Sequence, residues 1–253
     1  MTVSLKELES KLLQLLKPEQ FSDYCPNGLQ VQGRSQIQKI VTGVTACQAL
    51  IDAAALQNAD AILVHHGYFW RGEDQSITGL KKARIGKLLE HDINLLAYHL
   101  PLDVHSELGN NVQLAKLLEI DIEGDIYKQN NHGLVLEGRL NQTRSFEEFS
   151  DFVSGRLNRP CFAVQGGSKE INSIAWCTGA AQNYIEMAVD AGVDAYLTGE
   201  VSEQTVHIAR EAGIHFFAAG HHATERYGVQ AVGKYLADEY NIEHQFIDID
   251  NPI

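Results

Sequence analysis

Six of the eleven histidines in this 253-residue chain fall in three short segments, each of which follows an apolar stretch. The segments are ILVHHGYFW (62–70), YHLPLDVH (98–105) and AAGHHATER (218–226). Together they offer neutral imidazoles and two carboxylates, a ligand set that suits Zn, Mn, Fe, Co or Ni. We therefore expect these segments to bind a pair of divalent metal ions.

The first segment places His65 and His66 at the end of an apolar strand. Successive strand side chains point to opposite faces, so adjacent histidines do not easily chelate one ion. Where the backbone turns at Gly67, the two imidazoles can instead reach two neighbouring ions. The alternative is a pair of ordinary histidines that cap a buried strand.

The second segment contains two candidates, His99 and Asp103. Pro101 breaks the strand and fixes a turn, which lets Asp103 point back toward the strand edge, where a carboxylate can bridge two metals. Alternatively, Asp103 caps the next helix. His99 is a ligand, a group that orients a ligand, or a proton carrier.

The third segment predicts a helix that starts near residue 221. His221 and Glu225 are then four residues apart on one face, a spacing that lets two helical side chains bind one ion. His222 would point away from that face. In the alternative, a histidine simply begins the helix and an exposed Glu225 pairs with Arg226.

Weaker candidates lie near the same strand ends. Glu200 and Glu203 either line the site or act as ordinary acids at a helix start. Tyr68, Phe69 and Trp70 either stack against a flat ring or pack against neighbouring residues.

The sequence pattern predicts alternating strands and helices. Ser4 is the expected N-cap of a helix over residues 4–16. Strands are expected at 39–46, 61–66 and 93–100, and helices at 47–57, 79–91 and 108–118.

An internal repeat follows from the same pattern. The segment from Ile40 aligns without a gap on the segment from Ile174, and His99-x3-Asp103 aligns on His221-x3-Glu225. Any two strand–helix–strand units would show some such agreement, but the matching His-x3-acid patterns favour a true repeat.

We therefore expect an α/β fold of two similar, pseudo-symmetric lobes with mixed sheets flanked by helices. The first lobe spans residues 1–125 and the second spans residues 126–253; whether residues 240–253 return to the first lobe is left open. Right-handed crossovers place the loops at the carboxyl ends of the strands, where ligands bind in open α/β sheets. The metal site is accordingly expected in the cleft between the lobes.

The amino-acid composition limits the classes of partner that this protein could bind. The formal net charge is −13, with 20 basic and 33 acidic residues and no basic run, which disfavours nucleic-acid binding. Neither a signal peptide nor a membrane-spanning apolar stretch is found, and the four scattered cysteines suit a reducing compartment. We expect a soluble cytoplasmic protein that binds no membrane. The two carboxylates carry two negative charges and the two divalent ions carry four positive ones. The remaining positive charge favours a small anionic substrate.

Several of these motifs carry a family resemblance. DYCPNGLQVQG, VTGVTA, ADAILVHHGYFW, HLPLD, GVDAYLTGEVSEQ and GHHATER occur in this order over nearly the whole chain. The chain resembles the short bacterial members of the YbgI-like family, named GTP cyclohydrolase I type 2 homologues. The resemblance implies a dinuclear centre held by His65, His66, Asp103, His221 and Glu225, with His99 nearby. It also implies a toroidal homohexamer.

These features favour a metal-dependent hydrolase that uses a metal-bridging hydroxide on a purine ring or a phosphoester. His99 or Glu200 would move protons. The alternative is a metal-binding hexameric scaffold, chaperone or partner-docking protein without turnover.

Overall fold

The computed structural model describes residues 1–127, 133–167 and 170–253. Backbone contacts divide the chain into two compact units: unit 1 is Met1–Leu102 with Gly228–Asp250, and unit 2 is Asp103–Tyr227 with Asn251–Ile253. The sequence predicts a boundary at residue 125 and leaves open a return of residues 240–253 to the first lobe. In the structure, the chain passes between the units within α4 (Leu100–Val104), within α10 (Arg226–Tyr240) and again after Asp250.

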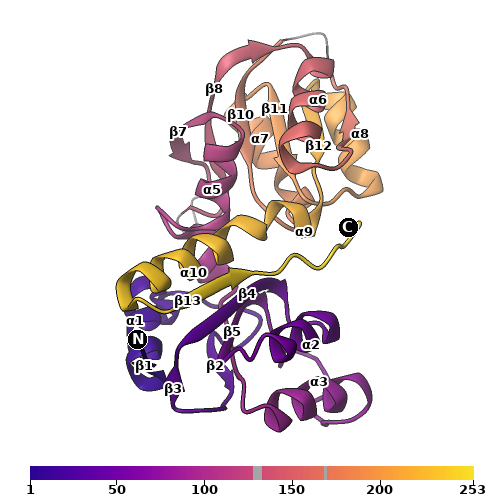
Figure 1. Cartoon of the computed structure of the whole chain (residues 1–253). Helices are drawn as coiled ribbons and strands as arrows, with labels where there is room; N and C mark the ends of the chain where they lie inside the picture. The colour runs from indigo at the N-terminus through magenta and orange to yellow at the C-terminus, as the bar shows by residue number, and fades with distance from the viewer. Residues whose placement is uncertain (128–132, 168–169) are drawn as a thin grey trace. The chain divides into compact units, whose positions relative to one another are not determined.

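Unit 1 is built on a five-stranded sheet of order β13-β4-β5-β6-β2 (Figure 1). Its strands are β1 (Val3–Ser4), β2 (Gly28–Val31), β3 (Gln36–Ile37), β4 (Lys39–Thr45), β5 (Ala61–His66), β6 (Asn94–Ala97) and β13 (Glu243–Phe246). Its helices are α1 (Leu5–Leu16), η1 (Pro18–Gln20), α2 (Gln48–Leu56) and α3 (Gly79–Glu90), with most of α10. β13, β4, β5 and β6 are parallel, and β2 is antiparallel to β6.

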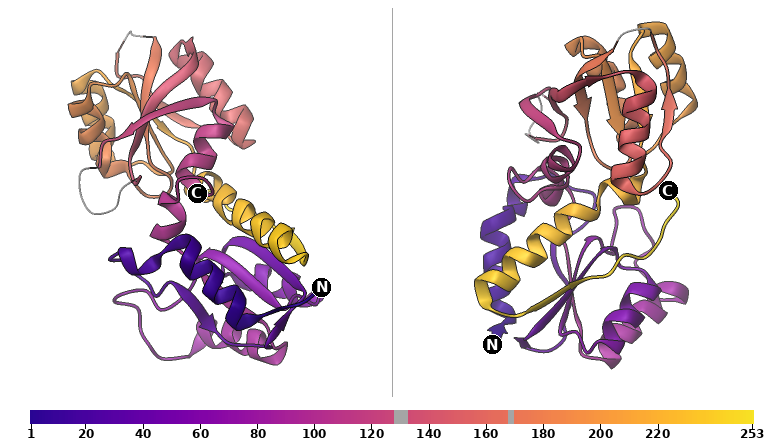
Figure 2. Two further views of the ribbon diagram at one scale, coloured as in Figure 1. Left: turned by 90° about the vertical axis from the view of Figure 1, so that its left-hand side faces the viewer. Right: turned by 45° about the horizontal axis from the view of Figure 1, so that its top comes forward.

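The helices α2 and α3 cover one face of this sheet (Figures 1 and 2). Leu50 and Ile51 of α2 and Leu88 of α3 pack against the inward side chains of β4 and β5, including Val41 and Ile62. Parallel strands joined by helical crossovers need both faces covered, which explains why β4, β5 and β6 are almost continuously buried.

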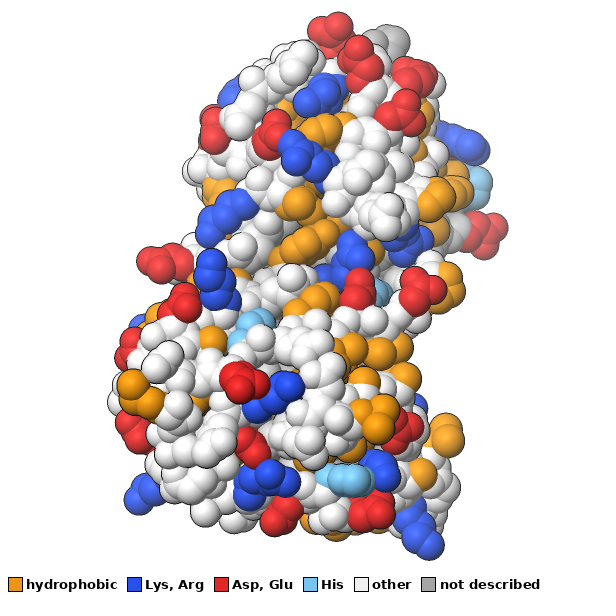
Figure 3. All heavy atoms as spheres, in the orientation of Figure 1, with side chains coloured by type: hydrophobic (Ala, Val, Ile, Leu, Met, Phe, Trp, Pro, Cys, Tyr) orange, Lys and Arg blue, Asp and Glu red, His pale blue; other side chains and the backbone are white. Residues whose placement is uncertain are grey.

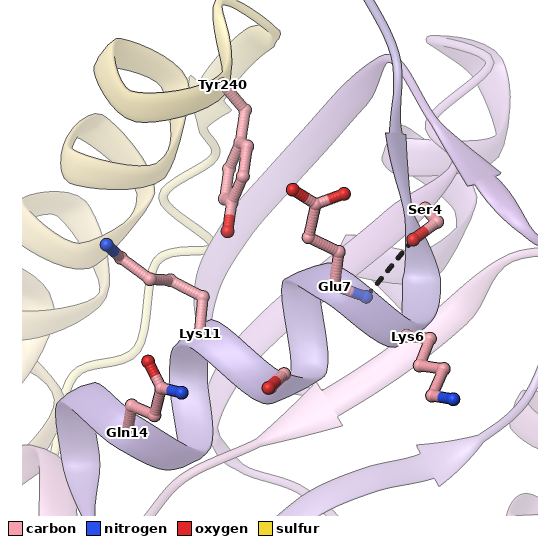
Figure 4. A pocket seen from close by; sticks show the side chains of 7 residues that line it. Ser4, Lys6, Glu7, Lys11, Gln14 and Tyr240 are labelled. Carbon is pink, nitrogen blue, oxygen red and sulfur yellow. Dashed lines mark hydrogen bonds between the residues drawn. The ribbon is translucent and has the colours of Figure 1, made fainter.

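The start of α1 has the cap that the sequence predicts. The Oγ of Ser4 accepts a hydrogen bond from the backbone N–H of Glu7, as Figure 4 shows. On the same helix, Lys11 donates to Glu239 of α10 at 2.7 Å and thereby ties α1 to the end of α10. The surface hollow drawn in Figure 4 contains none of the predicted site residues.

The strand predicted through residue 100 ends earlier, at Ala97. Beyond it, the backbone N–H of His99 donates to the side chain of Asn27 at 2.7 Å, and that of Leu100 donates to Asp23 at 3.0 Å. Two loop side chains therefore take the amides that a neighbouring strand would otherwise bind, and the short helix α4, which includes Pro101, begins at Leu100.

Unit 2 is built on a six-stranded sheet of order β7-β8-β10-β11-β12-β9. Its strands are β7 (Ile120–Asp125), β8 (Leu136–Arg144), β9 (Phe162–Val164), β10 (Ile171–Trp176), β11 (Ala195–Thr198) and β12 (His215–Ala218). Its helices are α5 (Asn110–Leu117), α6 (Phe146–Leu157), η2 (Gln182–Tyr184), α7 (Ile185–Ala191), α8 (Glu203–Ala212) and α9 (His221–Thr224). Trp176, Phe149 and Phe217 lie at the centre of its core.

The two units share a topology, which confirms the expected pair of similar lobes. In both, three parallel strands (β4-β5-β6 and β10-β11-β12) are followed by an antiparallel strand (β2 and β9). The register is also the same, because Ile40 pairs with Ala61 and Ile174 pairs with Ala195.

Two aspartates at equivalent positions of the repeat make the same hydrogen bonds in the two units. Asp60 accepts hydrogen bonds from the backbone of Gln38 and Lys39, and Asp194 accepts them from the backbone of Asn172 and Ser173. In each unit the carboxylate thus fixes the entry into the first parallel strand.

His244 of β13 gives unit 1 a pH-dependent stability. Its Nε2 lies 2.9 Å from the Thr42 hydroxyl and packs against Gly233, and burial lowers its pKa below the usual 6.5. The unfolded chain therefore binds the proton first, so this contribution is fully present above pH 6.5 and is lost as the pH falls toward the lowered value. We expect His244→Gln to reduce the change in unfolding free energy between pH 7 and pH 5.5 in urea titrations, whereas exposed His207→Gln leaves it unchanged. An equal pH dependence in both variants would contradict this role.

The surface drawn in Figure 3 carries basic side chains interspersed with acidic ones. Within the described ranges, no helix has the length and apolar character needed to cross a membrane.

Candidate metal-binding clusters

The first cluster lies at the carboxyl end of β5 in unit 1. The rings of His65 and His66 have centroids 4.5 Å apart, because the chain turns immediately after them. Gly67 permits this turn, since a Cβ at that position would overlap the side chain of Gln30. The Nδ1 of His65 hydrogen bonds to the carbonyl of Tyr98 at 3.0 Å.

His99 joins this cluster from the end of β6. One ring nitrogen from each of His65, His66 and His99 lies within 4.8 Å of the others. The Nδ1 of His99 is 2.7 Å from a carboxylate oxygen of Asp23. Burial raises the pKa of Asp23, but the hydrogen bond and the charge of His99 outweigh it, so the pKa lies below its usual value.

Cys25 also lies near His99 and Asp23. Burial and the nearby Asp23 charge raise the pKa of the Cys25 thiol to about 12. Burial thus disfavours the thiolate, the form that acts as a nucleophile, in the absence of a bound metal.

The aromatic residues after the first cluster have separate roles. Tyr68 is buried and donates to the carbonyl of Ala46, whereas Trp70 sets its ring edge-on to His99 with centroids 5.0 Å apart. Phe69 adopts a left-handed backbone with φ 65°, a strained conformation for a bulky residue. Trp70 is therefore the aromatic side chain of this segment that contacts the histidines.

The second cluster lies in unit 2 and contains both predicted carboxylates. Asp103 is buried and accepts hydrogen bonds from Asn110 at 2.9 Å and from Thr178 at 3.3 Å. It does not cap the next helix, because the N-cap of α5 is Gly109. A carboxylate oxygen of Asp103 lies within 4.8 Å of one of Glu225.

His221 and Glu225 face each other across one turn, as the four-residue spacing predicts. The Nε2 of His221 is 3.2 Å from Glu225, and its Nδ1 is 2.7 Å from Glu200. Burial alone would lower the pKa of His221, but the hydrogen bonds and charges of Glu225 and Glu200 raise it to about 9. Glu225 is only 3% exposed, so the alternative of an exposed residue paired with Arg226 is wrong.

Two further residues of this region are placed by the structure. Glu200 orients His221, whereas Glu203 is the first residue of α8, as expected for an ordinary helix-start acid. His222 belongs to none of the ligand groups found among the described residues, and its backbone N–H donates to the carbonyl of Ile253.

All four clustered imidazoles share one arrangement. The Nδ1 atoms of His65, His66, His99 and His221 contact, in that order, a backbone carbonyl, a hydroxyl and two carboxylates. Metal-binding histidines commonly use one ring nitrogen in this way, which fixes the tautomer and presents the other nitrogen to the ion. In His65, His66 and His221, Nε2 is therefore the nitrogen that a metal would take, and in His99 it is the nitrogen left to exchange a proton.

Sequence reasoning missed the residues that hold these side chains. Asp23 and Asn27 lie in a loop with little periodicity, and Asn110 and Thr178 lie far from Asp103 in the sequence. The available signal was the Asp23-x3-Asn27 spacing within DYCPNG, a spacing that brings the two side chains together at 2.9 Å.

Comparison with known proteins decides the family. The pattern of the Duf34/NIF3 (NGG1p interacting factor 3) family matches residues 3–252. The chain belongs to this family. A Duf34/NIF3 relative from Pseudomonas aeruginosa, named GTP cyclohydrolase 1 type 2 homolog, is 55% identical over 100% of both chains. A relative of the same name from Haemophilus influenzae is 53% identical and covers 97% of this chain and 98% of its own.

Solved structures agree with the Duf34/NIF3 assignment. Protein ybgI, described as of unknown function, superposes with a TM-score of 0.95 at 49% identity and covers 99% of this chain and 100% of its own. TTHA1606 from Thermus thermophilus gives 0.88 at 29% identity with the same coverage. The expected resemblance and the mixed α/β fold are thus both confirmed.

Proposed function

We propose that this protein is a metal-dependent hydrolase that binds two divalent ions through His65, His66, Asp103, His221 and Glu225. The observation that carries the proposal is the common use of Nδ1 by the clustered imidazoles. Metal-binding histidines almost always hold one ring nitrogen in this way, and here the arrangement recurs in every imidazole of the two clusters.

The donor set fits the ions that such hydrolases use. Imidazole nitrogens with carboxylate oxygens suit Zn, Fe, Mn, Co or Ni, whereas the absence of a thiolate argues against a zinc site of the cysteine type. When bound, paired ions lower the pKa of water and stabilise negative charge that develops on the substrate. Asp103 and Glu225 supply two negative charges against four positive ones, so the site would attract an anionic substrate.

We assign proton transfer to His99. Its Nδ1 is held by Asp23, and Trp70 packs against its ring, so the orientation of the imidazole is fixed. The substrate class proposed from the names of the relatives is the purine ring of GTP, with a phosphoester as the second class. The homohexamer implied by the resemblance stays a prediction.

The proposal is tested by metal removal and reloading. We expect the purified full chain to contain metal by elemental analysis and to release formate from GTP, or alcohol from a phosphoester. Chelation of the metal should abolish this release, and reloading should restore it. We expect His99→Gln to lower turnover about 100-fold with unchanged metal content, and His91→Gln to leave both unchanged. A fully loaded protein that depletes no substrate in a broad metabolite screen would reject hydrolysis and favour a non-catalytic metal-binding scaffold.

A further inference from the structure

A partly buried arginine of unit 2, Arg159, lies beside the strand end that leads into His221. The loop that carries it is fixed by Ser154 of α6: the backbone N–H of Arg159 donates to the Ser154 carbonyl at 3.1 Å, and that of Cys161 donates to the Ser154 hydroxyl at 3.0 Å. The next residue, Phe162, pairs with Ala218 at the end of β12. Arg159 is thus held in place by its neighbours on both sides.

The guanidinium of Arg159 packs directly on Gly220, the residue before His221. A Cβ at Gly220 would overlap Nη1 and Cζ of Arg159, and Gly220 has a φ of 99°, which other residues rarely adopt. Glycine is therefore required here for two reasons, and one of them is the close approach of the arginine.

One nitrogen of this guanidinium, Nη1, lacks an acceptor among the described residues. Its Nη1 is buried and finds no hydrogen-bond acceptor there, and no carboxylate of these ranges forms an ion pair with Arg159. A guanidinium is always protonated and presents five N–H donors, and a buried donor is normally satisfied. The side chain of Arg159 as a whole is only partly buried, so an incoming group can still reach the guanidinium, and its contact with Gly220 places that group next to His221.

We propose that Arg159 binds an oxyanion of the substrate, specifically a phosphoryl group, beside His221. The inference rests on the proposed function, because it places the anion next to a metal ligand. A planar guanidinium matches two oxygens of a phosphoryl group at once, which the point charge of a lysine does not. Arg159 thereby selects phosphorylated substrates and sets their orientation.

The test is the binding of inorganic phosphate to the metal-loaded full chain by calorimetry. We expect Arg159→Met to weaken phosphate binding at least about tenfold, with unchanged metal content. Arg159→Lys keeps the positive charge but loses the planar pair of N–H donors, so we expect an intermediate loss of phosphate affinity. This variant replaces Arg159→Met in the test if Arg159→Met does not fold. Exposed Arg156→Met, at the end of the same α6, is the matched control and binds phosphate as the parent does.

The outcomes separate the two proposals. A parent chain that takes up no metal rejects the proposed function. A loaded parent that binds no phosphate, or binds it as tightly after Arg159→Met as before, rejects the role of Arg159 while metal binding stands.

Discussion

Replacing Glu225 by glutamine is expected to lower metal affinity at least about 100-fold. Glutamine keeps the shape of the side chain but removes the charge of a buried carboxylate that lies 3.2 Å from His221 and within 4.8 Å of Asp103. Affinity is measured by competition with a coloured chelator, and metal content by elemental analysis.

The effect of Glu225 on the pKa of His221 bears on how a loss of metal affinity in Glu225→Gln is interpreted. Glu225 raises that pKa, so the substitution lowers it and reduces competition between proton and metal for Nε2. Stronger competition by protons at His221 therefore does not explain a loss of affinity, which instead supports Glu225 as a ligand. The matched control is Glu203→Gln, a nearby exposed acid at the start of α8, which should bind metal as the parent does. Equal affinity of the parent and Glu225→Gln would remove Glu225 from the ligand set.

The second large effect is expected on folding, at the two aspartates that the repeat makes equivalent. Asp60→Ala removes the acceptor of the backbone N–H groups of Gln38 and Lys39, and of Nη1 of Arg34. Hydrogen bonds to a charged group contribute about 1.5–3 kcal/mol each, but such contributions do not add fully and single substitutions rarely cost more than about 4–5 kcal/mol, so we expect a cost of about 4 kcal/mol. Asp194→Ala should cost about 3 kcal/mol for the same reason. Both values come from urea unfolding.

Exposed Asp52→Ala, in α2, is the control for these two variants and should change stability by less than about 0.5 kcal/mol. Asparagine at either position keeps one acceptor oxygen and should recover part of the loss. A cost in only one unit would show that the shared hydrogen bonds do not have a shared energetic role.

Sequence reasoning succeeded where periodicity is strong. The strand at β5, the capped helix α1 and the alignment of Ile40 with Ile174 all depend on apolar spacing that one sequence displays directly. The four-residue spacing of His221 and Glu225 worked for the same reason, because a single helical turn converts spacing into proximity.

The failures all involve side-chain contacts between segments far apart in the chain. β6 ends at Ala97 because Asn27 and Asp23, about seventy residues earlier, take the next amides. Local propensity contains no trace of such partners. The sequence offered Glu200 and Glu203 as two equal candidates near a helix start. Only the structure shows that Glu200 contacts His221.

The contacts of His99 and His221 show two ways of orienting an imidazole. Each histidine holds a carboxylate at Nδ1, at 2.7 Å in both cases, but Asp23 lies in the loop before β2 whereas Glu200 follows β11. Asp23 also accepts hydrogen bonds from the side chain of Asn27 and the backbone N–H of Leu100, and its side chain is only 3% exposed, whereas the side chain of Glu200 is 32% exposed. A carboxylate held by several donors keeps one position, so the ring of His99 is fixed more firmly than the ring of His221, which has more freedom to turn when a ligand arrives.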